Sequence, residues 1–210
     1  MNFLKTLLAT AVVVSAVPAM AYEAGDIMVK AGAVTVSPKN GNADIGALVA
    51  NSELDVQDDT QLGLTLTYMV TPQIGVEVLG ATPFSHDVKI DGGALDGATA
   101  AKTKHLPPTI SAQYYPLSGE SVVQPYVGLG VNHTFFFDEE DSAGLGTKGL
   151  ESSWGLAYSV GVNYDINDSW LLNVALWKMD IDTEIRGGAA DGVEVEIDPT
   201  VFFVGAGYKF

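Results

Sequence analysis

Long runs in which large apolar residues alternate with small or polar ones fill most of this chain. In TQLGLTLTYMV (60–70), Leu, Tyr and Val occupy the even positions from 62 to 70, while Gln, Gly and Thr occupy the odd positions from 61 to 67. The same period of two runs through QIGVEVLGATPF (73–84), PYVGLGVNHTFFF (125–137), SWGLAYSVGVNYDI (153–166) and TVFFVGAGYKF (200–210). A period of two is that of a β-strand whose two faces meet different surroundings. The pattern therefore predicts an all-β fold.

The connections between the predicted strands alternate in length. Segments at about 26–36, 104–115 and 170–183 bring the predicted strands to eight. The connections 71–73, 116–124 and 167–169 are short, whereas 37–59, 85–103, 138–150 and 184–196 are longer and rich in Gly and Asp. This arrangement is typical of outer-membrane barrels, in which closure leaves no unpaired edge in lipid. The predicted fold of residues 22–210 is an eight-stranded antiparallel transmembrane β-barrel with short periplasmic turns and longer extracellular loops.

A soluble barrel of the lipocalin kind is the main structural alternative. Such a barrel would turn its apolar face inward and a polar face to water. Here the face opposite the large apolar residues consists of Gly, Ala, Ser, Thr and Asn, which are too small for a solvated exterior. Aromatic residues also gather near the predicted strand ends, where interfacial girdles lie, and the C-terminal Phe210 resembles the assembly signal of bacterial outer-membrane proteins. These features favour the membrane barrel.

The first 21 residues predict export. Lys5 is followed by an apolar run and then by Ala19-Met20-Ala21, a small-x-small pattern expected at a signal-peptidase site. A membrane-anchoring helix is the alternative, but the apolar run is short for one, and no stretch of residues 22–210 offers 18 consecutive apolar residues. We therefore predict a signal peptide over 1–21, cleaved after Ala21, and the outer membrane of a Gram-negative bacterium as the destination.

The charge of the chain limits its partners. The formal net charge is −16, so the surface would repel the phosphates of nucleic acid. We expect outer-membrane lipid and lipopolysaccharide as its surroundings instead. The acidic loop segments FDEED (137–141) and DGVEVEID (191–198) are either solvated surface or a divalent-cation site that bridges anionic headgroups. The chain has no cysteine, so no disulfide framework holds it together.

The sequence predicts no catalytic, cofactor or metal site. His105 lies on the inward face of its predicted strand and His133 on the outward face of its own, so these two cannot share a site, while His86 begins a long predicted loop. The nucleophile-elbow, zinc-protease and P-loop motifs are missing from the sequence. DGGALDG (91–97) resembles a calcium loop only in composition and is predicted to be a flexible loop.

Several blocks of the chain resemble one known family. TQLGLTLTYMVTPQIGVEVLGATPFSH (60–86), HLPPTISAQYYP (105–116), PYVGLGVNHTFFFD (125–138), WLLNVALWKMDIDT (170–183) and the terminal GAGYKF are, in this order, similar to the OmpW family of outer-membrane proteins. The resemblance implies an eight-stranded barrel with a narrow apolar interior that passes small hydrophobic molecules and releases them sideways into the bilayer. It also implies a constriction by a leucine and a tryptophan, which match Leu79 and Trp177.

The alternation independently places Leu79 and Trp177 inside the barrel. Val78 and Leu176 belong to the outward sets of their strands, so the residues that follow them face inward. The same phase assigns Ala81, Ala175, Met179 and Ile181 to the lining of the lumen. Eight strands leave room for little more than side chains, so the alternative is that Leu79 and Trp177 merely fill the barrel.

Two classes of function follow from these patterns. One is passive uptake of small hydrophobic molecules with lateral release, and the other is a closed structural or recognition barrel that serves envelope integrity or docking through its loops. Interlocking charged and polar pairs would fill a closed barrel, whereas a hydrophobic conduit would avoid them. Among the inward positions considered, Glu77 is the one ionised exception, so the lining favours transport.

Two adjacent prolines interrupt the strand predicted at 104–115. Pro107 and Pro108 have no N–H to give to a ladder, and consecutive residues direct these groups to opposite neighbours. We therefore expect the two prolines to interrupt the hydrogen-bonded ladders with both neighbouring strands at nearly the same height along the barrel. Since unpaired backbone is costly in lipid, we interpret Pro107 and Pro108 as a lateral opening. The alternative is that they start a strand where proline is allowed.

Overall fold

The fold was analysed in a computed structural model, which describes residues 22–39, 41, 43–47, 49–117, 121–141 and 146–210. Residues 1–21 lie outside the described residues, so the signal peptide and its cleavage after Ala21 stay predictions. Within the described part of the chain, none of the helices is long and apolar enough to cross a membrane.

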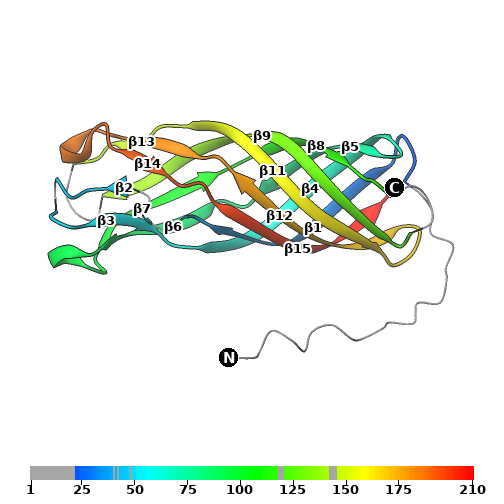
Figure 1. The fold of residues 1–210 in the computed structure, drawn as a ribbon, viewed down its shortest axis with the longest axis horizontal. Coiled ribbons are helices and arrows are strands. Elements are labelled where there is room, and N and C mark those ends of the chain that lie inside the picture. Colours follow the sequence, from blue (N-terminus) through cyan, green and yellow to red (C-terminus); the bar gives the residue numbers. More distant parts are fainter. Residues whose placement is uncertain (1–21, 40, 42, 48, 118–120, 142–145) are drawn as a thin grey trace, which may run out of the picture.

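Eight antiparallel strands form a closed barrel (Figure 1). Its strands are β1 (Ile27–Ser37), β4 (Asp59–Thr71), β5 (Ile74–Ala81), β8 (Thr109–Tyr114), β9 (Val123–Asp141), β11 (Ser153–Asp165), β12 (Trp170–Met179) and β15 (Thr200–Lys209). The first and last strands close the ring, because β1 pairs with β15 from Met28↔Lys209 to Ser37↔Thr200. The predicted fold is thereby confirmed.

The large apolar residues cover the outside of the barrel. On β4, Leu62, Leu64 and Leu66 are 47–62% exposed, whereas Thr65 and Thr67 on the other face of the strand are almost fully buried. An apolar exterior around a small and polar interior is the arrangement that lipid requires and that a soluble barrel reverses.

The barrel wall continues past the apolar exterior at one end. Here lie β2 (Ala43–Asp44), β3 (Glu53–Val56), β6 (Phe84–Asp91), β7 (Thr99–Leu106), β10 (Gly149–Leu150), β13 (Asp182–Arg186), β14 (Glu194–Glu196) and the short helices η1 (Gly93–Leu95) and η2 (Gly188–Ala190). Figure 1 shows these added strands at the end of the barrel opposite the C-terminus. The expectation that 85–103 is an irregular loop was therefore wrong: most of its inward positions are apolar or aromatic, and β6 and β7 form a hairpin on β9.

Two glycine-rich turns of similar geometry connect β6 to β7 and β13 to β14. In DGGALDG the first two glycines, Gly92 and Gly93, have φ of 84° and 66°, values that side chains rarely tolerate. The carboxylate of Asp96 accepts the N–H of Gly92 at 3.0 Å. In GGAADG (187–192), Asp191 accepts the N–H of Gly187. Both segments are thus specific turns, in which the aspartate stabilises the glycine conformation.

Candidate functional site

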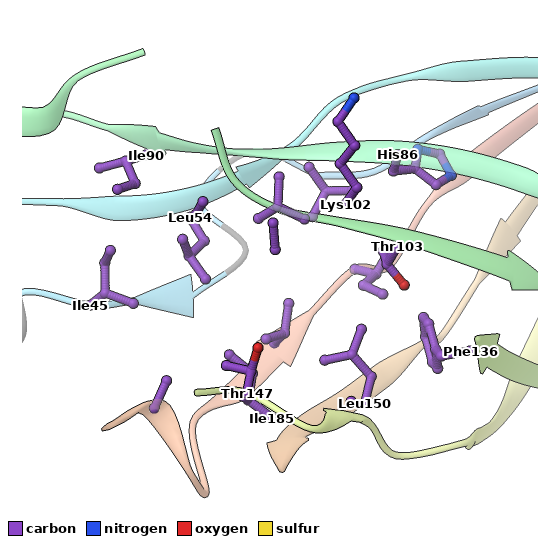
Figure 2. Close-up of a pocket in the computed structure, with 18 of the residues that line it drawn as sticks. Ile45, Leu54, His86, Ile90, Lys102, Thr103, Phe136, Thr147, Leu150 and Ile185 are labelled. Atoms are coloured by element: carbon purple, nitrogen blue, oxygen red, sulfur yellow. The ribbon is translucent and has the colours of Figure 1, made fainter. Parts of the chain in front are cut away.

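An apolar cavity of about 180 Å³ lies inside the extracellular extension of the barrel. We call it the outer pocket. Its walls come from β3, β6, β7, β13, β14 and the segments around them, and Figure 2 shows their side chains converging. The apolar lining includes Leu54, Val88, Ile90, Ile185 and Ile197. Each of these residues points inward from its strand because its neighbours in sequence are polar and face water. The outer pocket therefore presents a mainly apolar surface.

Stacked aromatic rings lie at the end of the outer pocket nearest the membrane. The rings of His86 and His105 stack with centroids 4.8 Å apart. Phe84 stacks on His105 at 5.3 Å, and the ring of Phe136, the partner of His105 on β9, is tilted against it at 5.9 Å. His86 and His105 line the outer pocket, whereas Phe84 lines a second cavity below it. The stack therefore separates the two cavities.

Both stacked histidines are neutral at ordinary pH. They lie outside the apolar band of the barrel, because the outward neighbours Lys102 and Lys104 are exposed and paired with Asp87 and Asp138. Burial lowers the pKa of His105 to about 3, and the neighbouring His86 adds to this effect. Burial also lowers the pKa of His86.

A second, much smaller cavity of about 10 Å³ lies below the stack. We call it the inner cavity. Leu79, Ala81 and Met179, which were assigned to the lumen lining from the sequence, meet here with Phe84 and Pro107. Pro107 is buried and faces the lumen, whereas Pro108 is exposed and faces outward. The inner cavity therefore adjoins the barrel wall at the level of the prolines.

The wall has a gap beside the inner cavity. The ladder between β5 and β8 ends at Leu79↔Thr109, and the ladder between β6 and β7 begins at Phe84↔His105. Within these described segments, no backbone hydrogen bond joins residues 80–83 to residues 106–108. Pro83 adds a third residue without an N–H, on the opposite edge of the gap.

The gap is one-sided, which corrects the expectation that the prolines interrupt both neighbours. On the β9 side the ladder lacks only Pro107 and Pro108, and the register is the same before and after them, at Leu106↔Phe135 and Thr109↔Asn132. The N–H of His133 donates to the carbonyl of Pro108 at 3.1 Å, and the side chain of Asn132 donates to the carbonyl of Pro107 at 3.1 Å. Since successive residues direct their backbone groups to opposite sides, Pro107 is the proline that faces the gap.

Polar side chains close the lower half of the lumen. Lys30 on β1 forms an ion pair with Glu77 on β5 at 2.7 Å, and both side chains are 1% exposed. Thr67 donates a further hydrogen bond to Glu77 at 3.0 Å. The Lys30 ammonium also lies 5.4 Å from the centre of the Tyr126 ring. These residues form the upper part of what we call the polar plug.

The lower part of the polar plug is a chain of amides and phenols. The amide of Asn173 donates to the hydroxyl of Tyr126 at 3.1 Å and to the side-chain oxygen of Asn163 at 2.7 Å. Asn163 in turn donates to the hydroxyl of Tyr22 at 2.8 Å. Tyr22 is only 3% exposed and packs edge-on against Tyr115, with ring centroids 5.2 Å apart. A straight route through the barrel therefore ends at the polar plug.

The comparison with known proteins agrees with this architecture. The sequence profile of the OmpW family matches residues 23–210. The chain belongs to the OmpW family. Outer membrane protein W of Vibrio cholerae is 45% identical over 212 residues, which cover 97% of each chain. The crystal structure of the outer membrane protein OprG from Pseudomonas aeruginosa is similar with a TM-score of 0.79 and 45% identity, over 90% of this chain and 97% of that chain.

A more distant relative is named for its genetic context. The dibenzothiophene metabolism operon protein PahQ of Pseudomonas aeruginosa is 27% identical over 169 residues, which cover 79% of this chain and 78% of its own. Family membership and the structural likeness to OprG place this barrel in the outer membrane, as predicted.

The predicted lumen residues of this OmpW-family barrel fall into two groups. Leu79, Ala81 and Met179 line the inner cavity together. Trp177, Ala175 and Ile181 are each 1% exposed but line neither the outer pocket nor the inner cavity. The Trp177 ring packs edge-on against Phe203 at 6.4 Å. All six point inward as expected, while the role of Leu79 and Trp177 as a constriction stays a prediction.

Three features of the site were missed in the sequence. Lys30 was not recognised as the partner of Glu77, His86 was assigned to a loop although it stacks on His105, and Pro83 was passed over. The alternation of Phe84, His86, Val88 and Ile90 was the signal that could have extended the strand and placed His86 inside.

Proposed function

We propose that this barrel takes up small hydrophobic molecules from outside the cell and releases them sideways into the membrane. The division of the lumen carries the proposal: an apolar outer pocket lies above, a polar plug blocks the way below, and the wall gap lies between them. Transfer of an apolar solute from water into the outer pocket lowers the free energy of the system, whereas transfer into the polar plug would raise it. The gap beside Pro107 is then its exit.

The likeness to PahQ supports an apolar aromatic as the class of solute. That relative is named for an operon of dibenzothiophene metabolism, and dibenzothiophene is an uncharged aromatic molecule. The apolar lining of the outer pocket suits such a molecule. On these grounds we propose small uncharged aromatic molecules as solutes.

A closed structural or recognition barrel is the second candidate function, and the polar plug favours it. A network of interlocking polar pairs is what a barrel without transport would contain, and here it occupies the periplasmic half of the lumen. The two functions differ in whether the wall gap matters. Only the transport proposal requires that closing it lowers solute entry.

Replacing Pro107 by valine should lower solute entry. The new N–H would point into the gap, toward the carbonyl of Ala81, the residue that continues the register of Leu79↔Thr109. One added hydrogen bond is worth about 1 kcal/mol, so entry should fall by about fivefold. The measurement is the initial rate of fluorescence increase of N-phenyl-1-naphthylamine in intact cells that produce the barrel.

Pro108→Val is the matched control, because its N–H would point to β9, where the register is already continuous. The rate of solute entry through this variant should stay within twofold of the parent's rate, which corresponds to a change in free energy of less than about 0.5 kcal/mol. If solute entered at the same rate through the parent, Pro107→Val and Pro108→Val, the gap would not be the exit, and the closed barrel would be the better description.

Leu79→Trp should also reduce entry, since the larger ring fills the inner cavity next to Pro107. Overpacking of this kind costs about 1–3 kcal/mol of stability, so heat-modifiable migration on a gel checks that the barrel has folded. Trp177→Phe is the comparison, because Trp177 lines neither cavity and its Nε1 donor has no partner within the described part of the chain. If instead Trp177→Phe changed entry and Leu79→Trp did not, the constriction would lie at Trp177.

A further inference from the structure

Three buried polar side chains lie together at the membrane end of the outer pocket. His86, Thr103 and His105 are 1%, 6% and 3% exposed, and all three line the pocket. They share the inner face of one hairpin, since His86 pairs with Thr103 and Phe84 pairs with His105 across β6 and β7. Figure 2 shows His86 and Thr103 among the mostly apolar side chains of the pocket. We call these three residues the polar floor.

Each residue of the polar floor has an atom without a protein partner. Within the described part of the chain, His86 Nε2, His105 Nδ1 and Thr103 Oγ1 are buried and form no hydrogen bond. Buried polar atoms are normally hydrogen-bonded, because an unsatisfied group keeps the full cost of its desolvation. Three of them at one end of an apolar pocket therefore indicate a place for a polar group of the bound molecule.

The chemistry of the polar floor limits which polar group fits. His86 Nδ1 contacts the backbone carbonyl of Gln57, so this nitrogen carries the proton. Because the ring is neutral, Nε2 is left with a lone pair that can only accept. The hydroxyl of Thr103 can rotate to donate or to accept. A group that both donates and accepts would therefore satisfy the two residues at once.

A charged group does not fit the polar floor. Of the two lysines on β7, Lys102 is among the residues that line the outer pocket, but its side chain is half exposed, is paired with Asp87 at 3.1 Å, and points away from the apolar side chains in Figure 2. The neutral histidines offer no positive charge to a carboxylate, and burying an unpaired ion is costly. A plain hydrocarbon, at the other extreme, leaves all three polar atoms without a partner.

We propose that the outer pocket selects small apolar molecules that carry a single hydroxyl group, such as phenols and aryl alcohols, with the hydroxyl held by His86 and Thr103 beside the ring of His105. The ring of the ligand lies against the apolar wall, and its hydroxyl donates to His86 Nε2 while it accepts from Thr103. This inference rests on the proposed uptake of small hydrophobic molecules and narrows the class of solute.

Three ligands of one shape test the inference on the unaltered protein. Equilibrium dialysis of the full barrel in lipid nanodiscs, corrected for nanodiscs without protein, compares 1-naphthol, 1-methoxynaphthalene and naphthalene. We expect 1-naphthol to bind about fivefold or more tightly than naphthalene, the effect of one or two added hydrogen bonds. The methoxy compound keeps the oxygen but cannot donate to His86 Nε2, so it should bind about as weakly as naphthalene.

Thr103→Val should lower the preference for 1-naphthol over naphthalene to about twofold or less. Thr65→Val is the matched control, because the Thr65 hydroxyl is also buried without a partner in the described part of the chain but does not line the outer pocket. If all three ligands bound with equal affinity and excess unlabelled ligand displaced them, the proposed hydroxyl site would be wrong, while the proposed uptake of hydrophobic molecules would stand. No displaceable binding of any of them would overturn both.

Discussion

Replacing Lys30 by methionine should lower the free energy of unfolding by about 3–5 kcal/mol. The ion pair of Lys30 with Glu77 lies inside a transmembrane barrel with both side chains 1% exposed. Without Lys30, the Glu77 carboxylate would stay buried and keep the hydrogen bond from the Thr67 hydroxyl at 3.0 Å, which supplies no positive charge. A buried charge without its counter-ion is among the most destabilising changes in a protein. Urea unfolding in lipid vesicles, followed by tryptophan fluorescence, measures the loss.

The double variant Lys30→Met with Glu77→Gln should regain most of this stability, since it removes both charges and keeps an acceptor for Thr67. Lys104→Met is a control for the loss of a lysine as such. Its ion pair with Asp138 is about half exposed, so the change should cost less than about 1 kcal/mol. A Lys30→Met barrel as stable as the parent would mean that the polar plug contributes nothing to folding.

A disulfide across the wall gap should abolish solute entry in a reversible way. The chain has no cysteine, so Ala81→Cys with Pro107→Cys introduces a single pair at positions that line the same inner cavity and continue one register. In the oxidised form we expect entry of N-phenyl-1-naphthylamine to fall by at least about tenfold, because a closed wall leaves no way from the lumen into lipid. A reductant should raise entry in the same cells to the rate of the reduced variant, which is itself about fivefold below the parent because residue 107 now has an N–H.

Val78→Cys with Ile110→Cys is the matched control for the disulfide. This pair lies in the intact part of the ladder between the same two strands and faces outward. Its oxidation should leave entry unchanged. Undiminished entry through the oxidised Ala81→Cys, Pro107→Cys barrel, with free thiols shown to be consumed, would contradict release between β5 and β8.

The face of each strand could be predicted from sequence because alternation reports it locally. Leu79 and Trp177 were assigned to the interior from the phase of their neighbours, and both are buried there. The same rule would have placed His86, but the charged outward residues of 85–103 resembled the composition of a loop. Outside the membrane a strand has polar outward residues, so its pattern is less distinct than that of a lipid-facing strand.

The sequence by itself determined the closed barrel, its apolar exterior and the inward set of residues. Only the tertiary structure decided which inward residues meet: Lys30 and Glu77 are 47 positions apart, and Asn163 and Tyr22 are 141 apart. A period of two specifies the face of a residue but not its height along the barrel, which depends on the stagger between all eight strands. For that reason the polar plug, the histidine stack and the one-sided gap at Pro107 became visible only in the assembled wall.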